Sequence, residues 1–137
     1  MNILFLSTEK LKEKLLSEIC CLEDVDLSEY YFQKTDGKGN EGTYIYSNNK
    51  GSYYFVYSER GNISKLKITD SVFEISFWFV NSIASEIAIK YMNDHYKTGE
   101  NYRTGLFNKQ LETLEKVGEN YKKAGEIEIS EILKNNP

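Results

Sequence analysis

Three glycines in the first third of the chain match the spacing of a phosphate-binding loop. They are Gly37-x-Gly39-x-x-Gly42. In such a loop the backbone N–H groups and the dipole of a following helix meet the phosphate, so the motif must lie between a strand and a helix. Here the residues that follow, Thr43 to Ser47, are rich in β-branched and aromatic side chains and predict a strand. We therefore interpret the glycines as a flexible hairpin loop.

Arg103 and Gln110 lie one heptad apart and share the apolar face of a predicted helix, beside Leu106 and Leu114. A guanidinium near a core is costly unless an acidic group pairs with it. We favour a buried polar clasp that fixes this helix on the sheet. Its members would be Glu59, Arg60, Asp70, Glu86, Arg103 and Gln110. The alternative is an arginine at the floor of a groove, where it would bind a carboxylate or a phosphate.

Metal and disulfide chemistry has little support in the sequence. Cys20 and Cys21 are adjacent, a spacing that rarely allows a disulfide, and His95 is the only histidine. Zinc needs four Cys- or His-type ligands, or three and a water molecule. The first residues also lack the charged region and the cleavage site of a signal peptide. We expect no metal, no cofactor and a location in the reducing cytoplasm.

The charge of the chain points to a protein partner. The sequence has 17 Lys+Arg and 21 Asp+Glu, a net charge of −4, which disfavours nucleic acid and suits a basic protein. No Lys or Arg interrupts the chain between Lys14 and Lys34. Trp78 falls on the polar arc of its predicted helix, where it is either covered by another element or an anchor for a partner. The candidate partner-binding residues are therefore Glu18, Glu23, Asp24, Asp26, Glu29 and Trp78. The many tyrosines of the predicted strands offer a second interface.

The first half of the chain predicts a helix followed by a sheet. A length of 137 residues suits a single domain, 1–137. Apolar residues at helical spacing predict a helix over residues 8–22. Alternating aromatic and β-branched residues then predict an antiparallel meander of three to four strands, with residues 34–42 as a loose segment. The expected strands are 30–32, 43–47, 52–58 and 63–68.

The second half predicts helices. Ser71-x-x-Glu74 is a capping box that opens a long helix over residues 71–95. Its longest uncharged stretch, 75–85, is far too short for a bilayer, so we expect no membrane contact. Two further helices are expected at residues 102–117 and 121–134. The fold class is therefore α+β, with a long central helix and a C-terminal helical pair packed on the sheet.

An ordered set of short motifs in the last three-fifths of the chain carries a family resemblance. An aromatic strand runs into Tyr57-x-Glu59-Arg60-Gly61, and Thr69-Asp70 opens a helix that carries Phe77-Trp78-Phe79. The remaining motifs are Arg103 before Phe107-x-x-Gln110-Leu111-x-x-Leu114, the aromatic Tyr121, and Ile129-x-x-Ile132-Leu133-x-x-x-Pro137. In this order they resemble the immunity protein 63 family of bacterial polymorphic toxin systems.

The resemblance implies an α+β protein that is not an enzyme. Such a protein would bind and neutralise a secreted toxin domain made by the same cell or by a neighbour. The charge of the chain adds the expectation that the toxin is basic. Two other functions stay open from the residues alone: a small enzyme or ligand-binding domain with a cleft around Arg103, Gln110 and Glu59, and an adaptor that self-associates through its tyrosine-rich strands.

Overall fold

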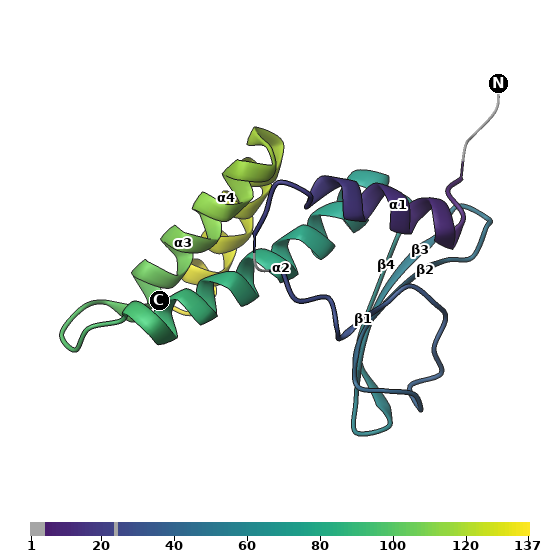
Figure 1. Cartoon of the computed structure of the whole chain (residues 1–137), viewed down its shortest axis with the longest axis horizontal. Coiled ribbons are helices and arrows are strands. Elements are labelled where there is room, and N and C mark those ends of the chain that lie inside the picture. Colours follow the sequence, from purple (N-terminus) through teal and green to yellow (C-terminus); the bar gives the residue numbers. More distant parts are fainter. Residues whose placement is uncertain (1–4, 24) are drawn as a thin grey trace. The chain divides into compact units, whose positions relative to one another are not determined.

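The computed structural model describes residues 5–23 and 25–137 (Figure 1). The described residues divide into two compact units. The first holds the residues up to Ser17 together with Asp26–Trp78, and the second holds Glu18–Val25 and Phe79–Pro137. The elements, in chain order, are α1 (Thr8–Glu18), β1 (Tyr30–Tyr31), β2 (Gly42–Ser47), β3 (Tyr53–Glu59), β4 (Asn62–Thr69), α2 (Val72–His95), α3 (Tyr102–Val117) and α4 (Glu119–Asn135). The α+β class is thereby confirmed, whereas a single domain and the packing of the helical pair on the sheet stay predictions.

Polar caps set the starts of the helices. The hydroxyl of Ser7 accepts a hydrogen bond from the N–H of Lys10 (3.2 Å), and that of Ser71 accepts one from Glu74 (3.1 Å). Each bond satisfies an N–H group that has no partner within the helix. The expected start of α2 is therefore confirmed to within a residue, and α3 has the expected bounds. The first helix is shorter than expected and ends at Glu18, four residues before the predicted end.

Tight turns join the antiparallel strands. The described strands lie in the order β1-β2-β3-β4. The β3–β4 hairpin has Arg60 and Gly61 as its two turn residues, with φ of 54° and 79°. Positive φ at both positions gives a turn whose twist matches that of the strands. The connection between β2 and β3 is longer, residues 48–52, and it also has positive φ at Asn49 (62°) and Gly51 (101°). Both turns lie where the sequence predicted them.

The expectation of a purely antiparallel meander was wrong, because β1 runs parallel to β2. Tyr30 pairs with Thr43 and Tyr31 with Tyr44. A hairpin of a few residues can only reverse the chain, whereas a parallel pair needs a longer connection, which residues 32–41 supply. The N–H of Thr43 donates to the carbonyl of Glu29 (2.8 Å), and this bond fixes the register of the pair.

The segment that carries the three glycines is neither a hairpin nor loose. The buried hydroxyl of Ser58 on β3 donates to the carbonyl of Gly37 (2.9 Å), and the hydroxyl of Tyr44 donates to that of Asn40 (2.7 Å). A Cβ at Gly39 would press on the Tyr44 hydroxyl. The glycines therefore let the connection lie close against the sheet. A strand and not a helix follows them, as expected, so this segment lacks the geometry of a phosphate loop.

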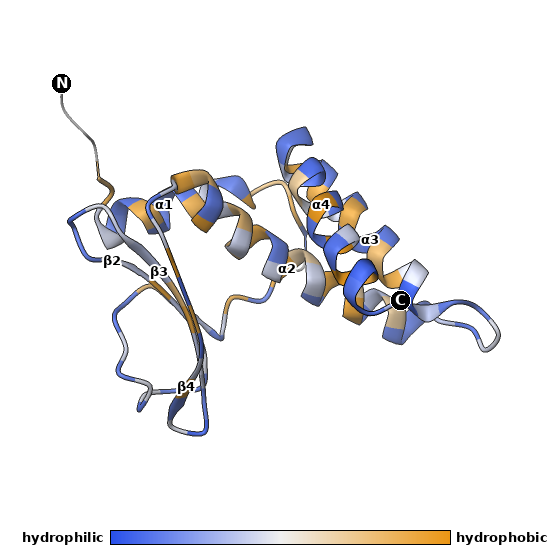
Figure 2. Cartoon of the chain, turned by 180° about the vertical axis from the view of Figure 1, so that it is seen from behind, coloured by the Kyte–Doolittle hydropathy of each residue, from blue (hydrophilic) through white to orange (hydrophobic). Residues whose placement is uncertain are grey.

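The two faces of the sheet have different surroundings. Residues directly opposite each other on paired strands share a face, which places Ile45, Phe55 and Lys67 on one face. The start of α2 lies against this face, since the Trp78 ring meets the Phe55 ring edge-on at 6.1 Å. Apolar residues line the strands and parts of α1 in Figure 2. The other face carries Tyr44 and Val56, which are buried. The connection 32–41 packs against this face near Tyr44.

In the second unit, α3 packs closely on α4. Gly125 of α4 lies against Leu114 and Leu111 of α3, where a Cβ would overlap a methyl group of Leu114. Leu114 and Ile129 are buried, as are several apolar residues of the second part of α2. The missing side chain at Gly125 therefore sets the short distance between the two helices. The two ribbons run side by side in Figure 1.

Among the described residues, α2 is the one helix whose length and composition would allow it to cross a membrane. Its most apolar window has a mean hydropathy of 1.4, and 44% of that window is buried inside the protein. The core helix of a water-soluble protein meets the same test. The uncharged stretch 75–85, which was tested as a membrane span in the sequence, is only part of this longer helix.

Gly42 offers a stability test of the parallel pair. A Cβ there would overlap the Glu29 carbonyl and meet the Tyr31 ring at 2.9 Å, at a φ of 148° that side chains rarely adopt. We expect Gly42→Ala to lower the free energy of unfolding by about 2–3 kcal/mol or more. The control is Gly61→Ala, where φ is also positive but the space is open, with an expected cost of about 1 kcal/mol. Denaturant unfolding measures both; equal costs would contradict the close approach of β1 to Gly42.

Candidate functional site

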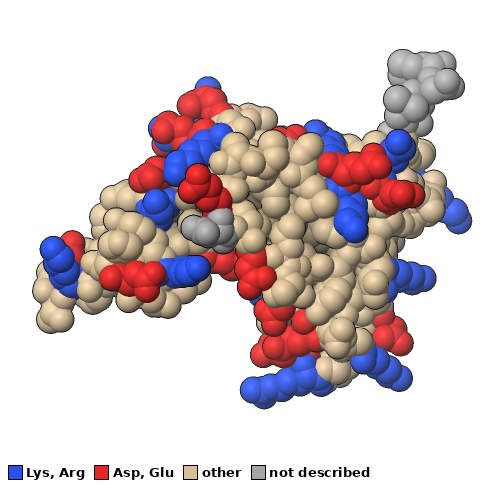
Figure 3. Space-filling view, in the orientation of Figure 1, with Lys and Arg blue, Asp and Glu red and all other residues tan. Residues whose placement is uncertain are grey.

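Three carboxylates gather around Tyr57 at one end of the sheet. Glu59 ends β3, Glu41 directly precedes β2, and Glu29 lies beside the start of β2 through its carbonyl. Burial raises the pKa of the Tyr57 hydroxyl, and the charges of Glu41, Glu59 and Glu29 raise it further. Figure 3 shows acidic side chains toward the lower part of the sheet, with Lys or Arg side chains beside them. This end of the first unit therefore brings three carboxylates near one tyrosine, and we call Glu29, Glu41 and Glu59 the acidic cluster.

The acidic run of the sequence is not the same feature. Glu18 and Glu23 belong to the second unit, Asp26 and Glu29 to the first, and Asp24 lies outside the described residues. A single surface formed by this run stays a prediction. Glu41 was missed, although its place just before a strand paired with the end of β3 could have suggested it.

A second feature of the first unit is an exposed apolar surface on β4. Ile63, Leu66 and Ile68 are 44%, 54% and 51% exposed. Next to them, Tyr46 and Tyr54 stack with ring centroids 4.8 Å apart, and both are half-buried. Leu66 and Ile68 share a face, as the sequence predicted, but the described residues leave them open to solvent. Two of the strand tyrosines thus lie beside this surface, and the tyrosine-rich interface expected from the sequence stays a prediction.

Trp78 is half-buried and packs within its own unit. The ring lies against Phe55, and the ammonium of Lys67 lies 5.1 Å from the ring centroid. An attraction between a cation and the face of an indole stabilises such a contact. The sheet therefore contacts the Trp78 ring without burying it fully. A role as a partner anchor stays a prediction.

The clasp residues are divided between the units. Gln110 is buried and donates from Nε2 to Oδ1 of Asn81 on α2 (2.7 Å). Arg103 is only half-buried, and its guanidinium lies 5.7 Å from the Phe107 ring centroid. Glu86 is an exposed residue of the same unit, whereas Glu59, Arg60 and Asp70 are exposed residues of the first unit. A clasp of all six stays a prediction, as does a cleft around Arg103, Gln110 and Glu59. Asn81 was missed because it falls on the polar arc of its helix.

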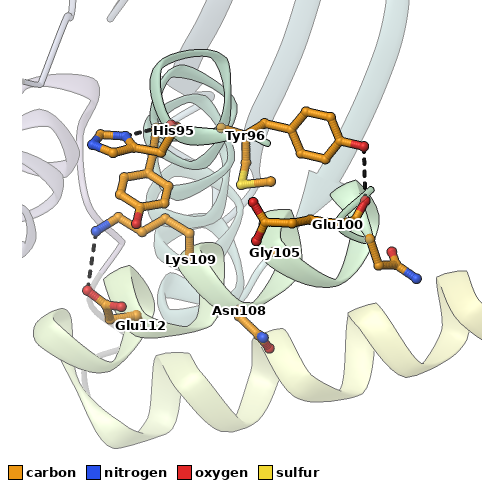
Figure 4. A pocket seen from close by; sticks show the side chains of 10 residues that line it. His95, Tyr96, Glu100, Gly105, Asn108, Lys109 and Glu112 are labelled. Carbon is orange, nitrogen blue, oxygen red and sulfur yellow. Dashed lines mark hydrogen bonds and ion pairs between the residues drawn. The ribbon is translucent and has the colours of Figure 1, made fainter. Parts of the chain in front are cut away.

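A hollow of about 260 Å³ lies between the end of α2 and the start of α3 (Figure 4). His95 stacks on Tyr91 with centroids 4.3 Å apart, and its Nδ1 lies 2.9 Å from the Tyr91 carbonyl. The ammonium of Lys109 lies over the Tyr91 ring and bonds to Glu112 (3.2 Å). These polar groups bond to one another, and no nucleophile meets a base among them. Within residues 5–23 and 25–137, no three His, Cys, Asp or Glu side chains are placed to hold a metal ion.

The described part of the first unit thus carries an exposed apolar strand and a neighbouring group of carboxylates. The chain matches the family model of immunity protein 63 over residues 48–131, more than half of its length, and it belongs to this family. The match spans β3, β4, α2, α3 and most of α4. Comparison with curated proteins and with solved structures gives no match. Family membership indicates a toxin-immunity role with a toxin as the partner.

The acidic cluster has a titration signature. The pKa of Tyr57 in the folded chain lies above its ordinary value of 10.0, so the neutral hydroxyl stabilises the fold at lower pH, and this contribution is lost as the pH rises through the folded pKa. We expect Glu41→Gln to lower the pKa of Tyr57, because it removes the carboxylate whose charge raises that pKa most among the three. NMR titration of ring-labelled tyrosine measures the shift. Glu74→Gln on α2 is the control; a Tyr57 pKa that moves equally in both variants would contradict the cluster.

The partly buried amide pair of Gln110 and Asn81 offers a second test. Gln110→Leu leaves Asn81 without its donor, and we expect a loss of about 1–3 kcal/mol in the free energy of unfolding. The double variant Asn81→Leu/Gln110→Leu removes both polar groups and should recover part of that loss. Denaturant unfolding of the four proteins gives the coupling energy. Strictly additive losses would show that the bond between the two side chains does not join α3 to α2.

Proposed function

We propose that this chain neutralises a cognate toxin by a tight, stoichiometric complex that covers the basic active site or substrate groove of the toxin. Membership of the immunity protein 63 family carries the proposal. The complex would form in the bacterial cytoplasm, with no bond made or broken by this chain. Nucleic acid and membrane are not among the proposed partners, and no cofactor is required.

Charge supports a basic toxin as the partner. The chain has a net charge of −4, and the acidic cluster brings three of its carboxylates to one end of the sheet. A patch of one sign steers an oppositely charged partner and raises the association rate. The exposed apolar residues of β4 lie on the same hairpin as Glu59, since Glu59 pairs with Asn62 at the start of that strand. A partner that docks at this end would therefore meet charge and apolar surface together.

Charge reversal within the acidic cluster tests the proposal. The toxin domain encoded beside this chain's gene is titrated with the wild type, with Glu29→Lys/Glu41→Lys, and with a control, Glu119→Lys/Glu131→Lys on α4. All four side chains are exposed. We expect a 1:1 complex, with the association rate of the cluster variant lower by about tenfold at low salt and the control nearly unchanged.

Salt gives the second readout. Screening shortens the range of the attraction, so the wild-type association rate should fall as salt rises from ~0.05 to ~0.5 M, and the cluster variant should lose most of this dependence. Cells that express the toxin should survive only with a binding-competent chain. No complex and no protection would refute the proposed function; a complex insensitive to both salt and charge reversal would refute the basic toxin.

A further inference from the structure

β4 is an edge strand with its outer side open. Among the described strands it pairs with β3 alone, and every residue from Asn62 to Ile68 is exposed. An edge strand presents N–H and C=O groups that have no partner in the sheet, a template on which another extended chain can pair. The two-residue turn at Arg60 and Gly61 fixes the strand against β3. The edge is therefore already formed before any partner arrives.

The two faces of β4 differ in chemistry. Lys65 and Lys67 lie opposite Tyr57 and Phe55 on one face, whereas Leu66 and Ile68 lie opposite Val56 and Tyr54 on the other. No acidic residue lies between Asn62 and Thr69. In a chain of net charge −4 this strand is thus locally basic on one face and apolar on the other. A strand that pairs with it would place acidic side chains beside the lysines and apolar ones beside Leu66 and Ile68.

The same charges disfavour a second copy of this chain in the antiparallel registers centred on Lys65, Leu66 and Lys67. Two β4 strands paired antiparallel about Leu66 would set Lys65 of one copy opposite Lys67 of the other. Pairing about either lysine would set that residue opposite itself. Like charges directly opposite each other destabilise a sheet, and lysine on an edge is a known protection against self-pairing.

We propose that β4 receives an extended segment of the cognate toxin in which acidic and apolar side chains alternate, so that the segment adds a strand to the sheet. This inference rests on the proposed function and specifies how the partner is held. Main-chain hydrogen bonds supply affinity in such pairing, and the alternating side chains supply specificity. Because Glu59 pairs with Asn62, the acidic cluster adjoins this edge. The toxin is then expected to carry this strand next to a basic surface.

Hydrogen exchange of the complex is the first arm of the test. We expect the amides of Asn62–Thr69 to exchange at least about tenfold more slowly in the wild-type chain bound to the toxin domain than in the free chain. The variant Lys65→Glu/Leu66→Ser should bind about tenfold more weakly or worse. Its control is Lys123→Glu/Ile127→Ser on α4, which changes the same charge and removes an apolar side chain that is 67% exposed. The exchange measurement needs no variant, so misfolding of either one leaves the test intact.

Blocked peptides form the second arm, which does not need the toxin. An octapeptide of alternating Glu and Val should shift the amide resonances of β4, and its Lys and Val counterpart should not. If the toxin domain binds and the β4 amides exchange as fast as before, the strand pairing is wrong while the proposed function stands. If no complex forms, the proposed function fails, and the peptides alone test the strand pairing. Equal shifts of the β4 amide resonances with both peptides, or no shifts with either, would overturn β4 as a site for an acidic strand. A wild-type dimer that Leu66→Ser dissolves would assign β4 to a second copy and also overturn the inference.

Discussion

The outer edge of β4, which no other described strand pairs, is the constraint on which the proposed binding mode depends. β4 is held on one side by its register with β3 and by a two-residue turn, and the exposure of Leu66 and Ile68 leaves apolar surface in water. Exposed apolar residues clustered on one strand mark an interaction site more often than scattered ones do. The toxin-immunity role of the family supplies a reason to keep such a strand.

Acidic and basic side chains lie next to each other on the surface beside β4. Glu29, Glu41 and Glu59 meet around Tyr57, and two lysines lie along the adjoining strand. Opposite signs side by side define an orientation for a partner, since a rotated partner would bring like charges together. The hollow between α2 and α3 differs in kind, because His95, Lys109 and Glu112 bond to neighbours within it. The proposed neutralisation by a tight complex would use the surface of the first unit and not this hollow.

The sequence predicts those parts of the fold that local chemistry decides. Ser7 and Ser71 cap their helices through hydrogen bonds to residues only three positions further along the chain. The turn at Arg60 and Gly61 likewise depends on these two adjacent residues. The direction of β1 could not be predicted, because it depends on contacts far apart in sequence, such as that of Ser58 with Gly37. The same holds for the candidate site. A run of acidic residues can be recognised in the sequence, whereas Glu41 comes near Glu29 and Glu59 only because of the way the strands pair.

The most direct measurement is a methyl NMR spectrum of the chain, labelled at Ile and Leu, with and without the toxin domain. Two groups of exposed methyl-bearing residues compete: Ile63, Leu66 and Ile68 on β4, and Ile127, Ile132 and Leu133 on α4. Binding at the sheet edge predicts shifted or broadened signals for the β4 group and unchanged signals for the α4 group. The reverse pattern would show that the toxin docks on the helical pair and would contradict a toxin-binding role for the sheet.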